Sequence, residues 1–246
     1  MLGLSLAQGC VATLIKVGWS PLALGNKLLA WWDAAYGLSL SGSQITAWAD
    51  RKNGYSAVQA IGAASPISAR VAGGPWVVYD GIDDELTLAS QPFGGDVEVR
   101  GVLKQDALAA DTSTRIALGF GGGTVGTSHR IVRIVSGAVN RAQFSVGNGA
   151  SGAFVAENTV DFSSRHLVKT RVFGGNGRLS VDGGTEATVA ATAAIGSTRL
   201  RFGAAEISSA AAFWKGAHRH FVFTTPNLTT EEAAKLDAYL LAERAL

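Results

Sequence analysis

Hydrophobic and polar residues alternate in short stretches through most of this chain. A period of two is typical of strands that bury one face, and turn residues separate these stretches at intervals of about 8 to 12 residues. Since one sheet cannot bury so many apolar faces alone, we expect two antiparallel sheets packed face to face. The predicted strands span residues 28–32, 45–48, 76–79, 85–88, 97–103, 115–120, 130–135, 143–146, 166–173, 178–181, 199–202 and 220–223.

The C-terminal end of the chain changes to a helical period. Thr229 and Glu232 form a capping-box pattern, in which each side chain pairs with the other residue's backbone N–H. Leu236 and Leu240 follow four positions apart and place apolar side chains on one helix face. The pattern predicts a single helix over about residues 230–244 that packs on the sandwich.

Composition excludes several classes of protein. The 47% apolar content can bury a core, which excludes a disordered chain, and a lone Cys10 excludes a disulfide scaffold or a four-cysteine zinc module. That unpaired thiol fits assembly in a reducing cytoplasm. A net charge of +2 without a basic run argues against a nucleic-acid partner. The 31 glycines fit a fold with many tight turns.

The first twenty residues differ from the rest of the chain. Residues 1–15 are mostly apolar but carry no Lys or Arg, and no run reaches the roughly 18 apolar residues of a membrane span. We therefore expect no membrane partner. Residues 1–20 are interpreted as an N-terminal arm that docks on a partner chain, with an added strand as the alternative.

A series of motifs resembles one known family. The motifs, in chain order, are LAWWD at 29–33, ITAWAD at 45–50, PWVVYDGIDD at 75–84, RHLVKTRVF at 165–173, GRLSVDG at 177–183 and WKG at 214–216. Together they resemble the concanavalin A-like, laminin-G-like jelly rolls of bacteriophage and bacterial surface proteins. Residues 19–24 also look like a start common in phage virion proteins.

This resemblance implies a fold and a role. The expected fold is an all-β, two-sheet antiparallel jelly roll over residues 21–246 with one C-terminal α-helix, preceded by the arm over residues 1–20. The expected role is a non-enzymatic virion structural or adhesion protein, namely a phage head or tail fibre, spike or decoration, assembled in the host bacterial cytoplasm. Its expected partners are other virion proteins, reached through the arm, and a host-surface polysaccharide, with homo-oligomerisation or multivalency on the particle. The alternatives are a polysaccharide-degrading glycoside hydrolase or lyase and a secreted carbohydrate-binding module.

The sequence predicts no catalytic residues. The hydrolase branch of this family carries an E-x-D-x-x-E strand, which we do not find, and no nucleophile elbow precedes a helix. Residues 121–126 match G-x-G-x-x-G by letter, but a β pattern follows where a dinucleotide site needs a helix. A hairpin loop is the preferred interpretation.

Four residues are candidates for glycan contact. Tyr55 and Trp214 lie near glycine-rich turns, so we expect their rings to be exposed. His218 and His220 stand where the family usually has an aliphatic residue and a Glu. Since they lie two apart in a strand, we expect both on one face, compatible with a ligand or a metal ion. The alternative is a polar outer face or a subunit contact.

The densest acidic cluster spans residues 80–85 at a strand–turn–strand corner. Asp side chains in such a place usually hydrogen-bond to the backbone of the turn. The alternatives are a Ca²⁺ site in which Asp83 or Asp84 acts with backbone oxygens, and a catalytic role for these carboxylates in polysaccharide cleavage. No other cofactor is expected.

Overall fold

A computed structural model describes most of the chain. The described residues are 18–59, 65–71, 74–90, 93, 95–105, 114–121, 128–136, 139–147, 153–160, 162–191, 199–205 and 212–245. Cys10, residues 1–17 of the predicted arm and residues 122–126 of the glycine-rich loop lie outside this set.

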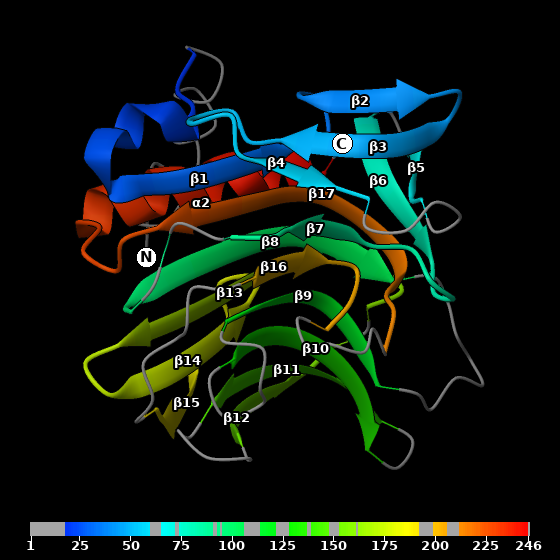
Figure 1. Cartoon of the computed structure of the whole chain (residues 1–246). Helices are drawn as coiled ribbons and strands as arrows, with labels where there is room; N and C mark the ends of the chain where they lie inside the picture. The colour runs from blue at the N-terminus through cyan, green and yellow to red at the C-terminus, as the bar shows by residue number, and fades with distance from the viewer. Residues whose placement is uncertain are drawn as a thin grey trace, which may run out of the picture.

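Strands dominate the described chain (Figure 1). A 3-10 helix, η1 (Pro21–Lys27), comes first, and helix α2 (Thr230–Arg244) comes last. The strands between them are β1 (Leu28–Asp33), β2 (Leu38–Ser41), β3 (Gln44–Ala49), β4 (Ser56–Val58), β5 (Ile67–Val71), β6 (Gly74–Asp80), β7 (Leu86–Leu88), β8 (Val97–Gln105), β9 (Arg115–Gly121), β10 (Ser128–Ser136), β11 (Val139–Gly147), β12 (Ala153–Thr159), β13 (His166–Phe173), β14 (Asn176–Val181), β15 (Ala187–Ala190), β16 (Arg199–Phe202) and β17 (Lys215–Thr224).

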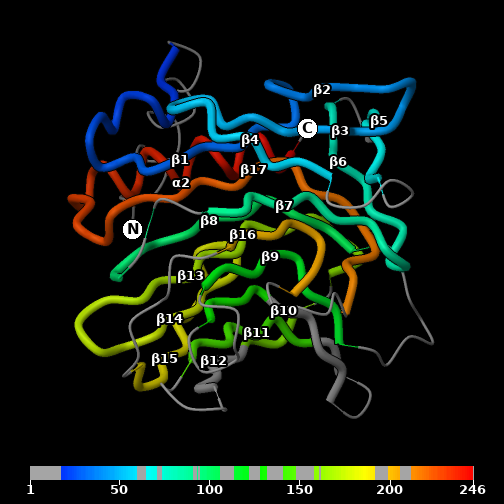
Figure 2. The backbone as a smooth tube through the Cα atoms, in the orientation of Figure 1, coloured from blue at the N-terminus to red at the C-terminus, as the bar shows by residue number. Residues whose placement is uncertain are grey.

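The strands form two antiparallel sheets that are continuous at one corner (Figure 2). The first sheet has the order β1–β17–β8–β13–β14–β15. The second has the order β2–β3–β4–β7–β16–β9–β10–β11–β12. Strand β6 pairs with β17 and with β5, and β5 pairs with β3, so these two strands connect the sheets. The predicted sandwich with a C-terminal helix is confirmed.

Alternation within β1 separates two hydrophobic cores. Trp32 faces the main core between the sheets, where its ring lies 5.1 Å from that of Phe202. Trp31 faces the opposite side and packs edge-on against Tyr239 of α2, with 5.9 Å between ring centroids. The strands β8 and β17 of the first sheet are therefore buried on both faces, by the second sheet and by α2. Nearly all of β17 is buried for this reason.

Helix α2 begins and packs as its sequence predicts. The Thr229 hydroxyl accepts from the Glu232 N–H at 3.2 Å, and the Glu232 carboxylate accepts from the Thr229 N–H at 2.7 Å, which completes the capping box. Leu236 and Leu240 are fully buried in the second core. The helix contacts β8, β13 and β17, and Arg100 of β8 donates to Asp237 at 2.5 Å. No helix of the described chain is long and apolar enough to cross a membrane.

Every predicted strand is present, but five further strands are not in the prediction. Strands β13 and β16 have the predicted bounds, and the other ten differ at their ends. The missed strands are β2, β4, β5, β12 and β15, which are rich in Ala and Ser. These residues have low β propensity, so such strands form because a neighbouring strand supplies hydrogen-bond partners.

Candidate functional site

The expectation of an exposed Trp214 is wrong. The residue is 0% exposed and belongs to the main core, where its indole N–H donates to the Lys104 carbonyl at 3.2 Å. Four other tryptophans are equally buried, namely Trp31, Trp32, Trp48 and Trp76. None of these five rings offers a face to a sugar.

The expectation that His218 and His220 share one strand face is also wrong. The pairing of β17 with β8 shifts register between these residues, so Arg219 is the extra residue of a β-bulge. A bulge reverses the alternation, and the rings therefore point to opposite faces. His218 enters the main core beside Tyr79, whereas His220 lies beside Trp31 under α2. Both are 0% exposed, so they cannot ligate one metal ion or contact a glycan.

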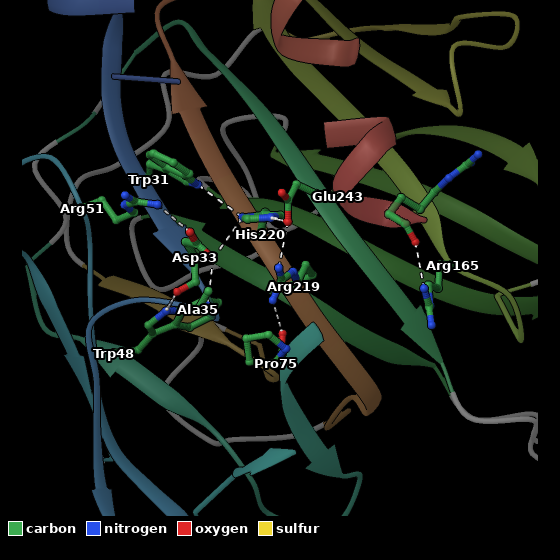
Figure 3. A network of polar contacts seen from close by, with 11 residues as sticks. Trp31, Asp33, Ala35, Trp48, Arg51, Pro75, Arg165, Arg219, His220 and Glu243 are labelled. Carbon is green, nitrogen blue, oxygen red and sulfur yellow. Dashed lines mark hydrogen bonds and ion pairs between the residues drawn. The ribbon is translucent and has the colours of Figure 1, made fainter. Parts of the chain in front are cut away.

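His220 belongs to a buried polar network that joins β1, β17 and α2 (Figure 3). Its Nδ1 accepts from the Trp31 indole N–H at 3.3 Å, and its Nε2 lies 3.3 Å from the Glu243 carboxylate. Arg219 donates to Glu243 at 2.8 Å and to the Pro75 carbonyl at 2.6 Å. The contacts of His220 and Arg219 outweigh burial and lower the pKa of Glu243 to about 2. These groups hold α2 on the first sheet.

Tyr55 lies at the edge of the main core. The residue is half-buried and packs against that core, and its N–H donates to the Asp50 carboxylate at 2.8 Å. Part of the side chain stays accessible, so its role in glycan contact stays a prediction.

Asp83 and Asp84 lie in the predicted corner between β6 and β7. Their carboxylates and that of Asp80 lie within 4.8 Å of one another. Asp80 accepts from the Ile82 N–H and Asp84 from the Asp80 N–H, each at 2.7 Å, which are the expected turn-forming bonds. Burial raises the pKa of Asp84 to about 6, and the neighbouring carboxylates contribute. These oxygens are of the type that Ca²⁺ prefers, so a calcium site stays a prediction.

A polar groove lies where the end of α2 meets the beginning of β13. Its volume is about 630 Å³, and it is open to solvent. The described lining residues come from β8, from the segment that leads into β13, from the first residue of β13, from the turn after β14 and from the last turn of α2: Lys104, Ser163, Ser164, Arg165, His166, Asp182 and Arg244. We call this set the basic groove.

Asp182 organises one wall of the basic groove. Its carboxylate lies 2.7 Å from Nδ1 of His166, accepts from the Leu167 N–H at 2.8 Å and pairs with the Arg244 guanidinium. Burial raises the pKa of Asp182, but these three contacts outweigh burial and the net effect is to lower the pKa. The backbone of Asp182 is left-handed, with φ of 54°, a conformation that Asp tolerates better than most residues.

Arg165 forms the other wall. Its guanidinium lies 5.4 Å from the centre of the Trp76 ring and donates to the Arg244 carbonyl at 3.1 Å, a contact visible beside the end of α2 (Figure 3). Arg165 and Arg244 are therefore held by fixed partners in the sheet and the helix. Arg244 also lies in the last helical turn, where a cation interacts favourably with the helix dipole.

A hydrogen-bond chain runs along the groove. The Ser164 hydroxyl lies 3.3 Å from Nε2 of His166, whose Nδ1 contacts Asp182. The order Ser–His–Asp matches the connectivity of a hydrolytic triad. Nucleophilic catalysis also needs donors placed for the developing oxyanion. The observed effect of these two hydrogen bonds is to fix the orientation of the His166 ring.

Sequence reasoning missed the basic groove as a site. Its residues lie as far apart as positions 104 and 244, and only folding brings them together. One signal was present, because Arg165 and His166 and then Asp182 occur in the motifs at 165–173 and 177–183. Those motifs predict strands, and nothing in their local pattern places their polar ends in one site.

The fold is shared with carbohydrate-active and receptor-binding proteins. No protein-family model and no curated protein matches this sequence. Domain 4 of AbnA, a GH43 extracellular arabinanase from Geobacillus stearothermophilus solved with arabinotriose, aligns with a TM-score of 0.60 and 14% identity. That alignment covers 87% of this chain and 98% of the domain.

Two further solved structures align over smaller shares of their own chains. The receptor-binding domain of botulinum neurotoxin type G has a TM-score of 0.58 and 9% identity, over 88% of this chain and 51% of that chain. The enzymatically active domain of bacteriophage CBA120 tailspike protein 2 has a TM-score of 0.52 and 11% identity, over 71% of this chain and 29% of that chain. At such identities the matches establish a common β-sandwich fold.

Proposed function

We propose that this chain is a non-enzymatic structural and adhesion module of a virion, which binds a host-surface glycan in the basic groove. The observation that carries the glycan-binding part is the groove itself, an open polar depression of about 630 Å³ walled by side chains with fixed partners. The similarity to a domain solved with arabinotriose favours a carbohydrate ligand. The phage motifs of the sequence and the tailspike match favour the virion context.

The dimensions and chemistry of the groove suit a short stretch of glycan. Ligand pockets usually measure about 300 to 1,000 Å³, and a few well-placed polar groups give them specificity. Ser163, Ser164 and the basic side chains supply hydrogen-bonding groups for sugar hydroxyls. A shallow open site binds each copy weakly, so several copies on one particle would supply avidity.

We expect multimerised protein to bind a subset of bacterial polysaccharides on a glycan array. Lys104→Glu reverses one charge of the groove and should abolish this signal, whereas Lys235→Glu, on α2 outside the groove, should retain it. No binding to any polysaccharide would contradict the glycan part. The virion part is tested separately by mass spectrometry of purified particles, and absence of the chain from them would contradict it.

The alternative function is serine hydrolysis, because Ser164, His166 and Asp182 are connected in the order of a hydrolytic triad. As a binding module, the protein should show no covalent labelling of Ser164 by a fluorophosphonate probe. Intact-mass measurement after incubation would report a single adduct if this expectation were wrong. Loss of that adduct in Ser164→Ala, but not in Ser163→Ala, would then assign hydrolase activity to the groove.

A further inference from the structure

The described residues of the basic groove offer charges and hydrogen-bonding groups, and no aromatic ring. None of the described residues that line it is Trp, Tyr or Phe. Five of the six tryptophans are 0% exposed, so they supply no stacking platform elsewhere in the described chain. Pockets for neutral organic ligands are usually lined by apolar and aromatic side chains, and this groove departs from that composition.

The groove carries an excess of positive charge. Among the described residues that line it, Lys104, Arg165 and Arg244 accompany one carboxylate, that of Asp182. Asp182 is already paired with Arg244 and hydrogen-bonded to His166 and to the Leu167 N–H. Among the described lining residues, the guanidinium groups of Arg165 and Arg244 therefore outnumber the carboxylate of Asp182 even without Lys104, and this positive charge favours an anion.

Arg165 is oriented for recognition of a planar anion. Contact with the Trp76 ring and the bond to the Arg244 carbonyl fix its guanidinium. That bond uses one of the five N–H donors of the group. A fixed guanidinium binds a carboxylate through two parallel hydrogen bonds and loses little conformational entropy on binding.

We propose that the basic groove selects glycans that carry a sugar carboxylate, of the uronic-acid type. This inference rests on the proposed glycan binding and names its ligand class. Arg165 would pair with the carboxylate, Lys104 would add long-range attraction, and the serines would contact neighbouring hydroxyls. Asp182 would act as a positioning residue that holds Arg244 and His166.

The test compares two polysaccharides that differ in the carboxylate alone. Polygalacturonate and its carboxyl-reduced form are titrated against the full chain by biolayer interferometry, with dextran sulfate as the sulfated anion. We expect at least about tenfold tighter binding to polygalacturonate, in line with the strength of charge-assisted hydrogen bonds. Binding should weaken as NaCl rises from about 0.05 to about 0.5 M. Arg165→Gln should remove the preference, whereas the control Lys235→Gln should keep it.

The outcomes separate the two proposals. Equal binding to both forms, or tighter binding to dextran sulfate, overturns carboxylate selection. On the glycan array, hits confined to neutral polysaccharides also overturn it but leave glycan binding intact. No hits on the array overturn both proposals. If Arg165→Gln fails to fold by circular dichroism, Arg165→Lys replaces it, with the same expected loss of preference, because Lys keeps the charge but cannot form two parallel hydrogen bonds with a carboxylate.

Discussion

Replacing His218 with leucine is expected to make the protein more resistant to acid. The imidazole is fully buried beside Tyr79 and Phe221, with ring centroids 4.5 and 4.9 Å away, and within the described chain neither nitrogen has a hydrogen-bond partner. Burial lowers the pKa of His218 to about 3. Leucine has a similar volume and no polar atom, so the free energy of unfolding at pH 7 should change little.

The expected effect appears as the pH falls. The unfolded chain binds a proton at His218 below about pH 6.5, whereas the folded chain binds it only near pH 3. Protonation therefore favours the unfolded state between these values, and stability is lost as the pH falls through this window. Between pH 7 and pH 4.5 the wild type should lose about 2 to 3 kcal/mol more than His218→Leu.

Urea unfolding at several pH values between 7 and 4.5 measures this difference. His129 serves as the comparison, because burial also lowers its pKa to about 3 but its Nε2 lies 3.0 Å from the Thr170 hydroxyl. His129→Leu should reduce the loss of unfolding free energy in acid by the same amount. It should also lower the unfolding free energy at pH 7, because the contact with Thr170 is lost. Parallel pH profiles for the wild type and His218→Leu would show that His218 is not a source of acid sensitivity.

Replacing Glu243 with glutamine is expected to destabilise the protein by about 2 to 4 kcal/mol at pH 7. Arg219 is nearly buried, with 6% of its side chain exposed, and Glu243 is its counter-charge at 2.8 Å. Glutamine keeps the shape but leaves this guanidinium buried without a charged partner. Because 21% of the Glu243 side chain is exposed, water offsets part of the cost.

Glu231→Gln is the matched control on the same helix. Its side chain is 77% exposed and pairs with Lys235 one turn away, so we expect a change below about 0.5 kcal/mol. The Glu243 contribution is present above about pH 4.5 and is lost as the pH falls toward the folded pKa of about 2. Denaturant curves of the wild type and Glu243→Gln should therefore converge below pH 4.5. Equal losses in the two variants at pH 7 would contradict a role for the buried network.

The strands that the sequence predicted best are those whose alternation continues through a buried sheet. Leu167 and Val168 of β13 are buried in the two different cores, and adjacent Trp31 and Trp32 of β1 are divided in the same way. A local period of two is sufficient to predict this arrangement. The capping box at Thr229 is equally local, since both of its bonds lie within one helical turn.

The candidate binding residues were predicted less well, because exposure is a property of the tertiary structure. Glycine-rich surroundings suggested an exposed Trp214, but its indole completes the main core between the sheets. The bulge at Arg219 arises from pairing between β17 and β8, and nothing in the local sequence marks it. One extra residue there sends His218 and His220 to opposite faces.

By itself, then, the sequence determined the sandwich, its strand alternation and its terminal helix, since these depend on periods that a few neighbouring residues carry. Only the tertiary structure decided where the chemistry lies. It buried Trp214, His218 and His220, which the sequence offered as ligand contacts. It also joined Lys104, Arg165, Asp182 and Arg244 in one groove, because β8, β13, β14 and α2 meet there by hydrogen bonding and packing between distant segments.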